Sequence, residues 1–219
     1  MTAPSPAPDA ALDHRHPALA PLLALGYPRA RIDQALAFYD EPHRHYHNRA
    51  HLREMLDGAL AMGCPLQPEQ SLAVVFHDAI YVPGAARGSN EAMSAQLLRV
   101  YGAGLPAPVL ELAIRIVIDT ADHLPRSEAA RLVLDLDLLR LAAGDEQFEQ
   151  HSREVFTEQR PLWPVVDDAQ AWSRFQRRRV AFFGRLLERP EIFCLPAFRL
   201  RYEQRARRNL LRAIATGNS

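Results

Sequence analysis

The feature that most limits the fold of this chain is an almost entirely apolar segment, residues 71–81. A helix built from these residues would have no polar face, and such a helix is stable only when other elements cover it on all sides. Two polar residues, His77 and Asp78, nevertheless stand side by side within the segment. A buried carboxylate needs a cation or several hydrogen-bond donors, because its desolvation is costly. The segment therefore predicts a helical bundle around a central helix, with a strong partner for Asp78.

Helical periodicity continues along the rest of the chain, and prolines and glycines separate the segments. No stretch alternates apolar and polar residues with a period of two, so we expect no sheet. The expected helices cover about residues 29–39, 45–62, 68–81, 90–101, 108–122, 127–141, 145–160, 167–188 and 198–215. Residues 1–16, rich in proline and alanine, are expected to be a disordered lead-in to a single all-α domain, residues 17–219.

Composition narrows the class of protein and its partners. Of the 219 residues, 48% are apolar and 24% are charged, as in globular proteins. The formal net charge is zero, so no overall field attracts nucleic acid. No run reaches the ~20 apolar residues of a membrane span, so no membrane is expected as a partner. With only Cys64 and Cys194 and no apolar signal-peptide stretch, the expected location is the cytoplasm.

Polar residues interrupt other apolar segments as well. Asp135 and Asp137 lie in a run of leucines, and His123 ends another nearly apolar segment. His47 and His51 are four residues apart, so on one helix they would share a face. One divalent cation would satisfy these separate groups together. Imidazole and carboxylate ligands without thiolate suit Mn, Fe, Co, Ni or Zn, and Mg where oxygen ligands dominate; one or two ions could bind.

The motifs YHNRAH, VVFHDAIY, SNEAMSA, IDTADH and LDLDLL follow one another in this order. This order resembles the H…HD…D signature of the HD-domain superfamily, especially the small bacterial proteins described as predicted metal-dependent HD phosphohydrolases. The resemblance covers roughly residue 31 to the C-terminus. It implies a single-domain, all-α bundle of the HD type with a central metal site. It also implies an enzyme, a phosphohydrolase acting on a phosphomonoester or phosphoanhydride in a nucleotide or another small phosphorylated metabolite.

The resemblance assigns four metal ligands by position, namely His51, His77, Asp78 and Asp137. His47 competes with His51 for the first position. Asp135 competes with Asp137 for the last, and the two cannot both face one ion, because residues two apart on a helix point roughly 200° apart. Leucines flank both aspartates, so periodicity does not choose between them.

Roles around the metal follow from the same resemblance and from general chemistry. Asp78 is expected to accept the proton of the attacking water, and Glu91 to orient this water or to hold His77. For Asn90 and Glu91, a role at the start of a helix is an equal alternative. The residues expected to contact substrate are Arg44, His47, Tyr81, Arg87, Asn90 and His123. Some HD nucleotidases carry a glutamate shortly after the dyad, whereas Ala-Ile-Tyr follows here, so their mechanism does not transfer directly.

Three other interpretations of these residues make different predictions. The chain could be a catalytically silent HD-fold protein that binds a metal or ligand. The arginines within residues 199–212 could instead bind nucleic acid, although a solvated helix face explains them better. Ion pairs such as Arg115 with Asp119 could satisfy the buried acids without a metal. The long amphipathic segments after Gly144 could also form a homodimer face.

Overall fold

The computed structural model describes residues 12–217, and every regular element within that range is a helix. The prediction of an all-α protein is therefore confirmed for this part of the chain. Residues 1–11 of the expected lead-in lie outside the described residues, whereas residues 12–16 lie against the bundle. Leu12 is buried, and its carbonyl accepts a hydrogen bond from Arg49. Among the described helices, none combines the length and apolarity needed to cross a membrane.

From α2 onwards the helices follow the expected order, whereas the helical residues 17–24 before it were not expected. They are α1 (Ala20–Ala24), α2 (Arg29–Ala37), α3 (Arg49–Ala61), α4 (Pro68–Phe76), α5 (Ser89–Tyr101), α6 (Ala107–Asp119), α7 (Glu128–Asp137), α8 (Asp145–Gln159), α9 (Asp168–Leu187), α10 (Pro196–Phe198) and α11 (Gln204–Gly217). Single turns of 3-10 helix are η1 (Pro17–Leu19), η2 (Phe38–Asp40), η3 (Leu138–Ala142) and η4 (Arg160–Leu162), and a π-helical turn, η5 (Arg199–Glu203), joins α10 to α11.

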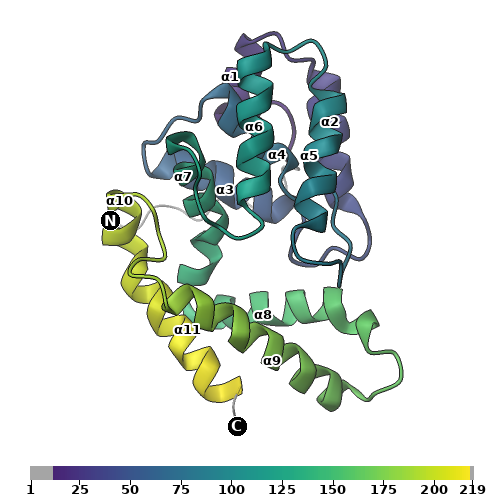
Figure 1. The fold of residues 1–219 in the computed structure, drawn as a ribbon, viewed down its shortest axis with the longest axis vertical. Helices are drawn as coiled ribbons and strands as arrows, with labels where there is room; N and C mark the ends of the chain where they lie inside the picture. The colour runs from purple at the N-terminus through teal and green to yellow at the C-terminus, as the bar shows by residue number, and fades with distance from the viewer. Residues whose placement is uncertain (1–11, 218–219) are drawn as a thin grey trace.

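Helix α4 lies inside the upper bundle of Figure 1, where it packs against α1, α2, α3, α5, α6 and α7. All residues from 71 to 77 are buried. The prediction of a fully covered helix is thus confirmed, for the reason that its sequence offers no polar face to water. The helix starts at Pro68, where the missing backbone N–H costs nothing, and Gln67 and Gln70 form a capping box.

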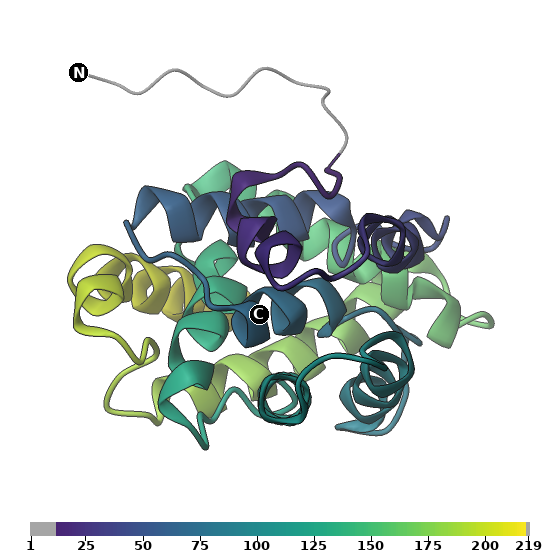
Figure 2. The same cartoon turned by 90° about the horizontal axis from the view of Figure 1, so that it is seen from above.

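A second layer, made of α8, α9 and α11, lies beneath the upper bundle (Figures 1 and 2). Helix α11 packs against α9 and η3, and α8 packs against both α9 and η3. Phe148, Phe183 and Leu210 carry this layer into the same apolar core as the upper bundle. Because η3 continues directly from α7, the layer lies next to the end of α7, and α9 therefore lies beside the candidate site.

Helix α3 begins later than expected, and this moves one histidine off the helix. Asn48 acts as the N-cap, because its side-chain oxygen accepts hydrogen bonds from the backbone N–H groups of Ala50 and His51. His47 therefore precedes the helix, whereas His51 lies in its first turn. The expectation that both histidines project from one helix face is wrong, and their rings meet edge to face across 6.4 Å between centroids.

Helices α4 and α7 end earlier than expected. His77 is the C-cap of α4, so Asp78 lies in the turn that follows and not inside the helix. Helix α7 ends at Asp137, and the chain tightens into the 3-10 turn η3 where a continuous helix to residue 141 was expected. Both site carboxylates thus stand at helix ends, where the backbone leaves the core and side chains can reach a common space.

Candidate metal centre

Two histidines and one aspartate converge where α3 begins and α4 ends. His51, His77 and Asp78 each offer one ligand atom, and these atoms lie within 4.8 Å of one another. The two imidazole Nε2 atoms are 3.3 Å apart, and Asp78 Oδ2 lies 3.1 Å from His77 Nε2. Both histidines are buried. This group could hold a metal ion.

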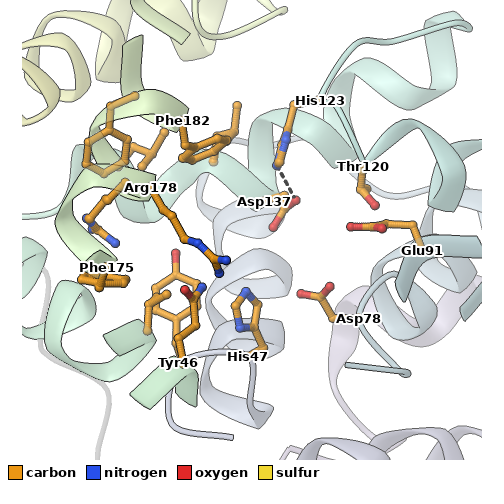
Figure 3. Close-up of a pocket in the computed structure, with 16 residues that line it drawn as sticks. Tyr46, His47, Asp78, Glu91, Thr120, His123, Asp137, Phe175, Arg178 and Phe182 are labelled. Carbon is orange, nitrogen blue, oxygen red and sulfur yellow. Dashed lines mark hydrogen bonds and ion pairs between the residues drawn. The ribbon is translucent and has the colours of Figure 1, made fainter. Parts of the chain in front are cut away.

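Asp137, the last residue of α7, reaches the same group from a third helix. Its Oδ1 lies 3.1 Å from His51 Nε2 and 3.6 Å from His77 Nε2. Its Oδ2 lies 3.1 Å from His123 Nε2, the contact drawn as a dashed line in Figure 3. Asp137 is therefore in contact with three histidines at once.

Asp135 points away from this group, as helical geometry requires for a residue two positions before Asp137. It is fully buried and accepts hydrogen bonds from the backbone N–H groups of Cys194 and Leu195 at 2.6 and 2.8 Å. Burial raises the pKa of Asp135 to about 6, although these hydrogen bonds oppose the shift. Asp135 holds the segment before α10 in place, and of the two aspartates only Asp137 faces the histidines.

The histidines and aspartates of the group shift one another's pKa values, because groups of opposite charge lie at short range. The Nδ1 atom of His77 lies 2.9 Å from the Val74 carbonyl and donates to it, which leaves Nε2 for the group. Burial alone would lower the pKa of His77, but Asp78 and Asp137 outweigh it and raise the pKa to about 9. Burial would also raise the pKa of both aspartates, yet the neighbouring histidines hold these pKa values well below the usual range. A cation at Nε2 would compete with a proton, so its affinity should fall at low pH.

The group opens into a cavity of about 280 Å³, near the lower end of the range for small-molecule sites. Figure 3 shows Asp78 and Glu91 on one side of this cavity and Phe175, Arg178 and Phe182 of α9 on the other, with His47 and Asp137 between them. One wall is thus acidic, and the opposite wall combines aromatic rings with arginine.

Glu91 and His123, both expected near the chemistry, line the cavity. Burial raises the pKa of Glu91, and the negative charges of Asp78 and Asp137 act in the same direction. His123 has a φ of +52°, a left-handed conformation that is uncommon for a residue other than glycine. Its ring contact to Asp137 and a 2.8 Å hydrogen bond from Arg189 to its carbonyl oxygen hold it there.

His47 also lines the cavity, but a buried glutamate that the sequence did not single out positions it. Glu158 of α8 accepts hydrogen bonds from the backbone N–H groups of His45, Tyr46 and His47 at 2.9, 2.7 and 2.9 Å. Its second oxygen lies 2.7 Å from His47 Nδ1. Burial alone would lower the pKa of His47, but Glu158 outweighs it and raises the pKa. In sequence, Glu158 resembles the other glutamates of this amphipathic helix, so no local signal identifies it.

Arg44 does not line the cavity, in contrast to its expected role in binding phosphate. Its side chain is fully buried and donates to the Glu41 carboxylate and to the carbonyls of Asp78 and Ala79. These contacts use its donors to fix the turn that carries Asp78. Arg44 is therefore a positioning residue for the dyad.

Tyr81, Asn90 and Arg87 also lie outside the cavity lining. The Tyr81 ring stacks on His47 with 4.2 Å between centroids, and its side chain also hydrogen-bonds with Glu158, so it supports the position of His47. Asn90 bonds to the backbone N–H and carbonyl of Val82, and thereby closes the loop before α5. Arg87 is exposed and lines a separate hollow of about 60 Å³ together with other arginines.

The structure shows the partners of Asp119 and of the arginines near the C-terminus. Asp119 is bound by Arg126, through its backbone N–H at 2.8 Å and its guanidinium at 3.0 Å, and not by Arg115 as suggested above. Several arginines near the C-terminus pair with acids. They are Arg199 with Glu191, Arg207 with Glu203, and Arg212 with Asp145. These pairs neutralise part of the charge that a nucleic-acid surface would need.

No known protein-family model matches this chain, and comparisons with curated proteins and with solved structures found no match. Function at this site is therefore inferred from its residues and their geometry.

Proposed function

We propose that this chain is a metal-dependent phosphohydrolase of the HD type, acting on a phosphomonoester or phosphoanhydride of a small molecule. The observation that carries the proposal is the convergence of His51, His77, Asp78 and Asp137 from three helices beside a cavity of small-molecule size. The four residues occur in the order H…HD…D. This order resembles the signature of the HD superfamily, whose signature residues bind a metal.

His51, His77 and Asp78 would hold the ion, with Asp137 as the fourth ligand. The contacts that join these four residues are 3.1 to 3.6 Å long. Ligand atoms about 2.1 Å from one ion lie roughly 3.0–3.4 Å apart in tetrahedral or octahedral arrangements, whereas those of His51, His77 and Asp78 are spread over up to 4.8 Å, so the side chains would draw together around an ion. The mixture of imidazole and carboxylate favours Mn, Fe, Co, Ni or Zn over Ca.

A divalent ion held by these residues would lower the pKa of a bound water and neutralise charge on phosphoryl oxygens. Asp78 is the residue that accepts a proton from the attacking water. As a carboxylate at the ion, it can also reach the attacking water. Arg44 fixes the backbone of this residue and thereby its direction.

Glu91 is suited to the opposite proton transfer. Burial raises its pKa, whereas the pKa values of Asp78 and Asp137 are lowered, so Glu91 is the most easily protonated of these three cavity carboxyls. Carboxyl groups whose environments separate their pKa values in this way divide the roles of acid and base. Glu91 would give its proton to the leaving oxygen.

The direct test is metal content followed by turnover. Purified protein is expected to contain about one equivalent of a transition metal, and His77→Ala to lose it. The loaded protein is then assayed with a panel of phosphorylated metabolites in Mn, Co, Ni, Mg and Zn. Bound metal without turnover on any substrate would point to a silent metal-binding protein, and absence of metal from both proteins would remove the basis of the proposal.

Metal binding should also be visible in stability, independently of activity. Mn²⁺ at about 100 times its dissociation constant is expected to stabilise the native state by about 2.7 kcal/mol, because the unfolded chain lacks the site. The increase in melting temperature should be absent in His77→Ala. An equal increase in both proteins would show that the ion binds elsewhere.

A further inference from the structure

Arg179 of α9 lines the same cavity as the metal group, and three aromatic rings enclose its side chain. Its guanidinium carbon lies 5.5, 5.6 and 4.6 Å from the ring centroids of Phe148, Phe175 and Phe183. Rings at these distances attract the cation through their quadrupoles. They offer no lone pair to its N–H groups, so the guanidinium lacks hydrogen-bond acceptors on these sides.

The two buried arginines of the described chain, Arg44 and Arg140, have acceptors. Arg44 donates to Glu41 and to backbone carbonyls, and Arg140 donates to both oxygens of Glu54 and to the Tyr46 carbonyl. For Arg179, by contrast, no hydrogen bond or ion pair is present among residues 12–217, and its buried Nε has no partner. Burial lowers its pKa to about 10, so Arg179 still carries its charge at neutral pH.

The cavity supplies no protein anion for this charge. Asp78 contacts His77 and Asp137 contacts His51, and the third carboxyl of the lining, Glu91, makes no ion pair with Arg179. Arg179 is half-buried, and its guanidinium has a buried Nε without a partner, so an anion that enters the cavity from solvent would satisfy it. Arginine presents a planar fork of donors that matches phosphate geometry. The aromatic rings beside it would lie against the apolar part of such a ligand.

We propose that Arg179 is the phosphate-binding residue of this cavity, and that it holds the phosphate of the substrate against the metal group. The binding of an anion stands on the surroundings of Arg179 alone, whereas its identification as the substrate's phosphate rests on the proposed function. The substrate class is thereby narrowed to a small phosphorylated molecule with an apolar or aromatic portion that contacts Phe175 and Phe182.

The test uses inorganic phosphate as the probe and calorimetry as the measurement, on the full chain with and without Mn²⁺. Arg179→Met keeps the length of the side chain, suits the ring surroundings and removes an unpaired charge, so folding should be retained. It is expected to weaken phosphate binding by about tenfold or more, the value of a charge-assisted contact. Mn²⁺ binding should be unchanged. Arg177→Met, an exposed position on the same helix, is the matched control and should bind phosphate as the parent does.

The outcomes separate this inference from the proposed function. The inference is supported if the parent binds phosphate without Mn²⁺ and Arg179→Met does not, even if neither protein binds a metal. Parent-like phosphate affinity in Arg179→Met would overturn the inference, as would a parent that binds no phosphate with or without Mn²⁺. A further variant, Arg178→Met, changes the neighbouring arginine of the cavity lining. Loss of phosphate binding in that variant alone would also overturn the inference. If the parent still binds Mn²⁺ in those cases, the proposed metal site remains supported although the role of Arg179 is excluded.

Discussion

Asp137→Asn is expected to abolish metal binding and to lower the proposed phosphohydrolase turnover by about a thousandfold or more, whereas Asp135→Asn keeps both. Removing the charge of Asp137 weakens the attraction for a divalent ion and leaves His51, His77 and His123 without their common carboxylate. The magnitude follows from losing both the metal's contribution to the reaction and the charge that orients three histidines.

Asp135→Asn is the matched control, because both aspartates lie on α7 two residues apart and both change by a single atom type. It should cost about 1–3 kcal/mol of stability, since the amide cannot accept well from both backbone N–H groups that Asp135 binds. Metal content and kcat of both variants provide the measurement, with urea unfolding for stability. Equal metal content in Asp137→Asn and the parent would exclude Asp137 as a ligand.

Glu158→Gln is expected to destabilise the native state by about 3 kcal/mol at neutral pH. The carboxylate accepts three backbone hydrogen bonds and pairs with His47 in a buried position, and an amide cannot replace these contacts. Burial would raise the pKa of Glu158, but His47 and the backbone donors lower it to about 2 from an ordinary value of 4.5. A shift of this size corresponds to about 3 kcal/mol.

The pH dependence of this contribution has a definite sign. Because the pKa is lower in the folded state than in the unfolded state, the stabilisation is complete above pH 4.5 and is lost as the pH falls from 4.5 towards 2. Urea unfolding at several pH values should therefore show a smaller decline over this interval in Glu158→Gln than in the parent. Glu149→Gln, an exposed position on the same helix, should follow the parent. Parallel curves for Glu158→Gln and the parent would contradict the assignment.

Local sequence patterns were sufficient to predict the helical architecture. The order of the helices follows from apolar periodicity interrupted by proline and glycine, and the burial of α4 follows from a segment without a polar face. The need of His77 and Asp78 for partners inside the protein could be anticipated because both interrupt an apolar segment, whereas His51 was chosen over His47 only by the resemblance to the HD superfamily. The HD-type assignment and the role of each residue remain proposals.

Only the tertiary structure decided which polar groups share the cavity. Leucines flank both Asp135 and Asp137, so the sequence contained no difference between them, and the packing of α7 against α3 brings only the latter to the histidines. The helix start at Asn48 moved His47 off α3, since a cap depends on local hydrogen bonds that periodicity does not describe.

Charged residues illustrate the same limit. Arg44 was expected to bind phosphate and instead holds the turn of Asp78, while Arg179 and Glu158 reach the site from the second layer without any local signal. Hydrophobic periodicity specifies which side of a helix is buried, because burial depends on that helix alone. The partner of a buried charge depends on which distant helix packs against it. This sequence by itself therefore determined the helices and the need of the buried polar groups for partners. The packing of the two layers determined which groups line the cavity.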